Sequence, residues 1–245
     1  MSQPNLQPGD PASESPRRRL KRRLAAREPI AGISPEHASP SLVEVLGRSG
    51  FDLIFIDCEP GGPGIERVAD MVRAARAAGT VSVLRPWSSD PGLIRRYLAC
   101  GIDGLILPET ETVTQIESVR AAIAAASPPD AENLLLIPLI ESVAGIANAA
   151  EILRADGVDA IQVGPGDLAV SMGLPRYGGH RRVAEAMFDV FGLARRLGKS
   201  AGGPPGNLGI RGMADAGGNF VMFFANSLLR QAAQAALAAV RGAGP

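Results

Sequence analysis

Blocks of apolar residues alternate with longer segments of mixed polarity along most of this chain. After residue 28, short runs rich in Val, Ile, Leu and Phe predict strands at 29–33, 51–57, 81–85, 104–108, 134–141, 159–163, 199–202 and 219–224. Apolar residues at helical spacing predict helices at 39–49, 64–78, 90–100, 111–126, 142–156, 181–197, 207–216 and 226–241. Many of these helices open at Ser, Asp, Thr or Asn and close at Gly, residues that cap helix ends.

Eight strand-then-helix units in about 215 residues predict a (β/α)8 TIM barrel. The strands are continuous apolar runs, as expected when both faces of a parallel sheet are covered. A doubly wound open sheet is the main alternative, but it needs a Gly-rich dinucleotide turn after the first strand, where the chain reads GISPEHASPS. We therefore expect one α/β barrel domain over residues 29–245.

The first 28 residues differ in kind, because they are Pro/Ser-rich and then strongly basic between Arg17 and Arg23. We expect residues 1–28 to form a disordered basic tail. One interpretation is an electrostatic arm for nucleic acid or another anionic surface. The other, which we favour, is a solvated tail that leads into a short helix.

Charge balance, cysteine content and hydropathy exclude several classes of protein. Acidic and basic residues balance at 25 each, which argues against a nucleic-acid partner for the whole surface. The two cysteines, Cys58 and Cys100, have no paired spacing, so we expect no disulfide or zinc framework and a reducing, cytoplasmic location. No apolar run approaches the roughly 20 residues that span a bilayer, and the N-terminus lacks the apolar region of a secretory signal.

Ionisable residues recur where the predicted strands end. In a TIM barrel the catalytic residues lie at the carboxyl ends of the strands. Five successive units carry such residues there: Asp57, Glu59, Arg85, Glu109, Glu141 and Asp167. Any one of them can be a solvated loop residue, but all of them at one rim point to a site.

Two of these carboxylates, Glu141 and Asp167, follow adjacent strands and suit a hard divalent cation such as Mg²⁺ or Mn²⁺. The alternative is a pair bonded to arginine or to backbone N–H groups. Arg85 would face the metal and hold an oxygen anion between two positive charges, as in the enolate of a 2-oxo acid; the alternative is a structural network with the rim acids. Gly164 and Gly166 would let the backbone approach a ligand, while Asp167 could also cap the next helix.

The segments GFDLIFIDCE, LRPW, LIPLIES and VDAIQVGPGDLAVSMG, in this order, resemble the HpcH/HpaI family of metal-dependent (class II) pyruvate aldolases. The family includes 2-dehydro-3-deoxyglucarate and 4-hydroxy-2-oxoheptanedioate aldolases, and siderophore-associated citrate synthases share its scaffold. The resemblance implies a (β/α)8 barrel of the phosphoenolpyruvate/pyruvate-binding type. It also implies a homo-oligomer, a hexamer or trimer of dimers, in which the last helix is exchanged between subunits.

The same resemblance implies roles for single residues. Glu141 and Asp167 would hold Mg²⁺, Mn²⁺ or Co²⁺, and Arg85 would stabilise the pyruvate enolate. The backbone around Gly164, Gly166 and Asp167 would bind the substrate carboxylate. Asp57 would be the partner of the general base.

Three departures from the family pattern concern the base and the loops. The family motif D-x-E-H reads Asp57-Cys58-Glu59-Pro60 here, so proline replaces the base histidine. The long Arg-Gly loop after the fourth strand is missing, and GISPEH stands where many members carry a tryptophan. Glu59, His37 or a metal-bound water are the candidates for the missing base.

The leading functional hypothesis is a divalent-metal-dependent carbon–carbon lyase, an aldolase that acts on a small 2-oxo acid through a pyruvate-type enolate. A citrate-synthase-like condensing enzyme and a catalytically impaired binding or scaffold relative are the alternatives. A phosphate-handling barrel, suggested by the Gly-rich segment SAGGPPGN, ranks below them.

Overall fold

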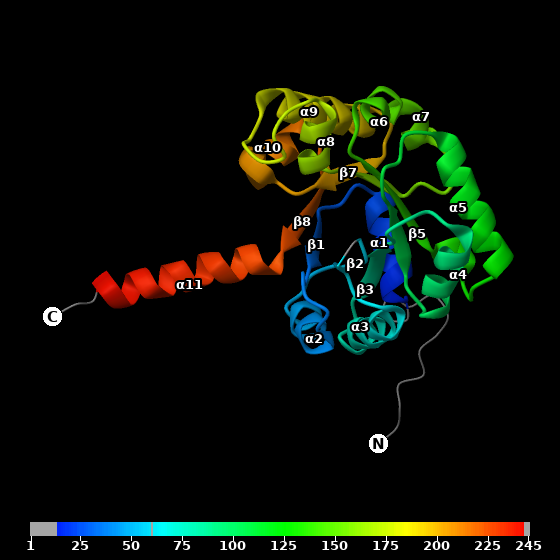
Figure 1. Ribbon diagram of the computed structural model, residues 1–245, viewed down its shortest axis with the longest axis horizontal. Helices are drawn as coiled ribbons and strands as arrows, with labels where there is room; N and C mark the ends of the chain where they lie inside the picture. The colour runs from blue at the N-terminus through cyan, green and yellow to red at the C-terminus, as the bar shows by residue number, and fades with distance from the viewer. Residues whose placement is uncertain (1–13, 60, 243–245) are drawn as a thin grey trace, which may run out of the picture.

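The computed structural model describes residues 14–59 and 61–242, and its centre is a closed barrel of parallel strands (Figure 1). The barrel follows the chain order, and the last strand pairs with the first. The strands are β1 (Ile30–Ser34), β2 (Leu53–Asp57), β3 (Val81–Arg85), β4 (Gly104–Leu107), β5 (Leu135–Ile140), β6 (Ala160–Val163), β7 (Ser200–Gly203) and β8 (Phe220–Phe224). The predicted (β/α)8 barrel is confirmed.

Helices follow the strands on the outside of the barrel. They are α2 (Pro40–Arg48), α3 (Ile65–Ala77), α4 (Pro91–Ala99), α5 (Val113–Ala126), α6 (Val143–Ala147), α7 (Ala149–Arg154), α8 (Pro165–Ser171), α9 (Arg181–Arg196), α10 (Gly209–Ala216) and α11 (Ala225–Gly242), with short 3₁₀ turns η2 (Ala131–Asn133) and η3 (Gly206–Leu208). The single helix expected over 142–156 is wrong, because it divides at Asn148 into α6 and α7.

Side-chain caps explain where several of these helices begin. Ser39 accepts a hydrogen bond from the Leu42 N–H at the start of α2, and Asp90 accepts one from Leu93 N–H at the start of α4. Thr112 and Gln115 form a complete capping box on α5. Each cap satisfies N–H groups that the first helical turn leaves without partners, so the local sequence determines these boundaries.

Strand residues divide between two cores by alternation. Outward-facing residues such as Ile54, Ile56 and Leu84 pack against the helices. Inward-facing residues such as Phe55 and Val83 fill the barrel itself. The carboxyl ends of the strands therefore lie above a tightly packed apolar barrel interior, which restricts the positions of the side chains there.

The basic segment predicted as tail is a helix over much of its length. Residues 1–13 lie outside the described part of the chain, but Pro16–Ala25 form α1, which lies across the middle of the barrel in Figure 1. Leu20 and Leu24 are only 2% and 1% exposed and pack among the first residues of the strands. The short helix expected after the tail is present, but the expectation of disorder up to residue 28 is wrong, because two leucines one turn apart close the amino end of the barrel.

The charges of α1 are directed at the barrel. Arg17 and Arg18 both contact Asp130 at 2.9 Å, and Lys21 contacts Asp159 at 2.8 Å. This part of the basic run therefore neutralises acidic groups on the same chain.

The last helix, α11, extends away from the barrel (Figure 1). None of its residues is buried, and Leu229, Leu237 and Val240 are 69%, 51% and 74% exposed. No helix in the described residues is both long and apolar enough to cross a membrane.

Candidate active site at the carboxyl ends of the strands

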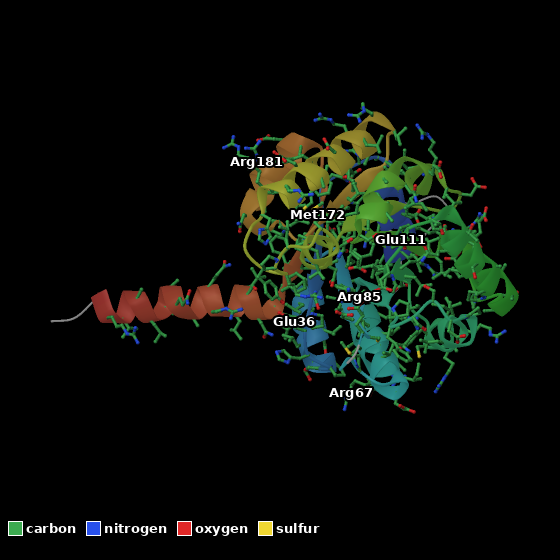
Figure 2. All side chains as sticks on the ribbon, turned by 45° about the horizontal axis from the view of Figure 1, so that its top comes forward. Glu36, Arg67, Arg85, Glu111, Met172 and Arg181 are labelled. Atoms are coloured by element: carbon green, nitrogen blue, oxygen red, sulfur yellow. The ribbon has the colours of Figure 1, made fainter. Side chains whose placement is uncertain are left out.

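Arg85 and Asp57 face each other because the register of β2 and β3 pairs them directly. Arg85 Nε donates to Asp57 Oδ1 at 2.9 Å, and Nη2 donates to Oδ2 at 2.6 Å. Nη2 also lies 2.8 Å from Glu59 Oε2. Figure 2 shows Arg85 over the middle of the barrel, whereas Arg67 and Arg181 lie at its periphery. Two carboxylates therefore hold the guanidinium in one orientation.

The environment of Arg85 keeps it charged and leaves one nitrogen for a ligand. Its side chain is 15% exposed, and its Cζ lies 5.6 Å from the centroid of the Phe55 ring below it. Burial opposes the charge, but the hydrogen bonds and charge of Asp57, with the charge of Glu59, outweigh it and raise the pKa of Arg85. Among the described residues, Nη1 makes no hydrogen bond.

Glu141 directly follows β5 and is 6% exposed. Its Oε1 accepts a hydrogen bond of 2.8 Å from the backbone N–H of Glu109. Burial, with the negative charges of Glu59 and Asp167, raises the pKa of Glu141 to about 7, against the lowering effects of that hydrogen bond and of Arg85. The site thus holds a carboxyl group that takes up or loses a proton near neutral pH.

Two backbone features shape the surroundings of Glu141. Glu109 has a left-handed φ of 48°, which residues other than glycine rarely adopt, and in that conformation its N–H reaches Glu141. A Cβ built on Gly164 would lie 2.9 Å from Glu141 Oε2, so only glycine leaves the carboxylate its place. Sequence reasoning assigned the rim role of Glu109 to its side chain, whereas the structure uses its backbone.

Asp167 lies in the first turn of α8, whose N-cap is Gly164 without any side-chain cap. The expectation that Asp167 caps this helix is therefore wrong. Instead Asp167 forms two hydrogen bonds with Arg176, one of them 2.8 Å from Nη1 to Oδ2. Sequence reasoning missed Arg176, because nothing in the segment GLPRYGGH marks it as a partner of an acid nine residues earlier.

The donor set of Glu141 and Asp167 fits a divalent ion with one condition. Within residues 14–59 and 61–242 no three His, Cys, Asp or Glu side chains are grouped as a metal site. Two carboxylates suffice for an ion such as Mg²⁺ when water and substrate oxygens supply the other ligands. The condition is that Asp167 exchanges Arg176 for the ion, since the guanidinium now provides its counter-charge.

His37 lines a cavity of about 390 Å³ together with Asp57 and Glu59. Its side chain belongs to an exposed loop after β1, and its Nε2 lies 2.9 Å from Asn226 Oδ1 at the start of α11. Glu36 binds the same residue, because its Oε2 accepts from Asn226 N–H at 2.7 Å. His37 therefore lies beside the acids of β2 but is held by α11. Pro60, the position of the expected base, lies outside the described residues.

Glu59 is the acid of this cavity with an altered affinity for protons. Burial raises its pKa, Arg85 lowers it, and the charges of Asp57, Asp167 and Glu109 raise it further. The negative charges of Glu141's neighbours Glu59 and Asp167 act on it, and the charge of Asp167 likewise acts on Glu59.

Known proteins with related sequences share one family. The sequence model described as HpcH/HpaI aldolase/citrate lyase matches residues 35–202. A hydroxypyruvate/pyruvate aldolase of Delftia acidovorans is 31% identical over 247 residues, which cover 91% of this chain and 92% of that protein. A 5-keto-4-deoxy-D-glucarate aldolase of Salmonella paratyphi C is 29% identical over 208 residues, covering 75% and 80%.

Solved structures agree with this likeness. A HpcH/HpaI aldolase/citrate lyase family protein from Burkholderia cenocepacia J2315 superposes with a TM-score of 0.83 at 27% identity, over 91% of this chain and 99% of that one. The citrate synthase SbnG superposes with a TM-score of 0.79 at 24% identity, over 91% and 97%, which shows a common fold.

Proposed function

The chain belongs to the HpcH/HpaI aldolase/citrate lyase family, and we propose that it is a divalent-metal-dependent aldolase that acts on a 2-oxo acid through a pyruvate-type enolate. The named relatives are aldolases, and one of them is a hydroxypyruvate/pyruvate aldolase. We therefore infer a carbon–carbon lyase rather than a condensing enzyme or a binding relative.

The arrangement of Arg85 is the observation that carries the proposal. Asp57 and Glu59 fix its guanidinium, and within residues 14–59 and 61–242 nothing occupies Nη1, which can therefore bind a ligand oxygen. A preorganised donor of this kind stabilises charge that develops on an oxygen in the transition state. An enolate oxygen has that charge, so Arg85 would bind it more tightly than the neutral keto group.

Glu141 and Asp167 would hold the ion, with Mg²⁺, Mn²⁺ or Co²⁺ as candidates. When bound, such an ion polarises the 2-oxo group and makes the adjacent carbon more acidic. The backbone of Gly164, Gly166 and Asp167 would bind the substrate carboxylate, because the glycines present no side chain there.

We propose Glu59 as the general base. It shares a cavity with Asp57 and His37, and burial raises its pKa, which makes its carboxylate a stronger base. In cleavage, Glu59 removes the proton of the C4 hydroxyl and the C3–C4 bond breaks as the aldehyde forms. The electrons of the C3–C4 bond form the enolate of pyruvate, and Glu59 then returns the proton to C3 to give pyruvate.

Exchange of the pyruvate methyl protons with deuterium tests this proposal without knowledge of the aldehyde. NMR should show exchange with Mg²⁺, Mn²⁺ or Co²⁺ and none with a chelator. Arg85→Met should lower the rate by about 10²–10³, and Glu59→Gln by about 10²–10⁴. His37→Asn should retain it; a loss there alone would transfer the base role to His37.

Folded protein that shows no exchange with any of the three ions would refute the aldolase proposal. Incubation with oxaloacetate and an acyl-coenzyme A then tests the condensing alternative. Absence of Mn²⁺ and pyruvate binding in calorimetry would instead favour a binding relative.

The assembly and location belong to the same proposal. The exposed apolar residues of α11, Leu229 and Leu237 among them, support a homo-oligomer, with a hexamer or trimer of dimers as the expected form. Light scattering should show an oligomer that Leu229→Asp combined with Leu237→Asp reduces in size. The free thiols Cys58 and Cys100 support a cytoplasmic location.

A further inference from the structure

Gln162 is a polar residue inside the apolar barrel. Its neighbours on β6, Ile161 and Val163, belong to the outer core between strands and helices. Ala160 belongs to the inner core. Since side chains alternate along a strand, Gln162 faces inward with Ala160. Gln162 is 4% exposed, so its side chain is buried.

The amide oxygen of Gln162 lacks a partner in the described part of the chain. The strand register explains why: Leu139 on β5 and Gly202 on β7 flank it, and neither has a polar side chain. Buried side-chain oxygens in native proteins nearly always have a hydrogen-bond partner, either protein or ordered water. An acceptor in this position therefore calls for a donor that is not part of the protein.

The same register places Gln162 beneath the proposed ion site. Glu141 follows Leu139 by two residues and Gly164 follows Gln162 by two, so both belong to the next inward-facing layer. Glu141 Oε2 makes no hydrogen bond within the described residues and lies against Gly164. Two acceptor oxygens, Gln162 Oε1 and Glu141 Oε2, thus belong to successive layers of one apolar interior.

We propose that Gln162 is a positioning residue, whose Oε1 accepts a hydrogen bond from a water molecule that lies between it and the carboxylate of Glu141. A water molecule has two O–H donors and satisfies both acceptors at once. It thereby holds the Glu141 carboxylate in the orientation that binds the ion. This inference rests on the proposed function, because it assigns Glu141 as an ion ligand.

Mn²⁺ titration, followed by electron paramagnetic resonance of the free ion, tests the inference. Gln162→Leu should raise the dissociation constant about tenfold, as loss of a group that orients a metal ligand does. The same variant should raise the urea midpoint of the metal-free protein, since it removes a buried polar group. Ile161→Val, on the outward face of the same strand, is the matched control and should leave the dissociation constant unchanged.

Unchanged Mn²⁺ affinity in Gln162→Leu would overturn the inference and leave the proposed function intact. If the wild-type protein binds no Mn²⁺, the proposed function and this inference fall together. Gln162→Met, a flexible side chain of similar length, replaces the leucine variant if that protein does not fold, and the same two outcomes apply.

Discussion

Replacing Glu141 with glutamine should stabilise the metal-free protein in mildly alkaline solution. Glu141 is 6% exposed, and burial, with nearby negative charge, raises its pKa from an ordinary 4.5 to about 7. At about 1.4 kcal/mol per pKa unit, this shift corresponds to about 3 kcal/mol. Glutamine carries no charge, yet its oxygen can still accept the hydrogen bond from Glu109 N–H.

The direction of the pH dependence follows from proton linkage. The folded protein holds the Glu141 proton up to about pH 7, whereas the unfolded chain releases it near pH 4.5. Between these values the native state binds more protons, so the free energy of unfolding falls as pH rises. The full penalty is present at pH 8 and is absent below pH 4.5.

Thermal and urea unfolding in chelator at pH 5 and pH 8 measures this effect. At pH 8 Glu141→Gln should exceed wild type by about 3 kcal/mol, or about 6–12 °C in melting temperature for a chain of this size. The gap should narrow toward pH 5. The control Glu117→Gln, on the exposed face of α5, should change stability by less than about 0.5 kcal/mol. Equal stability of wild type and Glu141→Gln at pH 8 would refute the claim that burial raises the pKa of Glu141.

Three further predictions concern other parts of the molecule. Leu24→Ala should lower the free energy of unfolding in urea by about 2–5 kcal/mol, because Leu24 is 1% exposed beneath the barrel. The exposed Arg22→Ala is its control, and an equal loss in both variants would show that α1 does not seal the core. Burial raises the pKa of Cys58 to about 12, so iodoacetamide at pH 8 should modify Cys58 only after the protein unfolds. Mass spectrometry measures the labelling, and rapid labelling of the folded protein would contradict this prediction. Gly164→Ala should weaken Mn²⁺ binding about tenfold or more, because the new Cβ would lie 2.9 Å from Glu141 Oε2. The control Gly212→Ala, whose Cβ would meet nothing nearer than 3.6 Å, should bind Mn²⁺ as wild type does.

Strand and helix positions could be read from the sequence because they depend on local patterns. The predicted strand at 81–85 is β3, and the predicted helix at 90–100 is α4, begun by the Asp90 cap. The division at Asn148 was missed, and the short helix expected after the tail was not expected to be buried against the barrel. In α1 the run of arginines and lysine concealed the two leucines, whose burial depends on the distant strands around them.

Strand ends also predicted where the candidate site residues lie. Asp57, Arg85 and Glu141 stand at or just after the ends of β2, β3 and β5, as the barrel geometry requires. The sequence did not determine the hydrogen-bond partners of these residues. Sequence reasoning placed Arg85 either opposite a metal or in a network with the rim acids, and the structure shows it bound to Asp57 and Glu59.

The order of apolar and capping residues thus determined the barrel and the edge at which its charged groups gather, since periodicity and helix caps act over a few neighbouring residues. Only the tertiary structure decided which atoms those groups leave available to a ligand. The pairing of Arg176 with Asp167 and of the Glu109 N–H with Glu141 arises from contacts between strands and loops, and the Gln162 oxygen has no partner in the described part of the chain because of its strand neighbours. Such contacts depend on register and burial, which exist only once the barrel has closed.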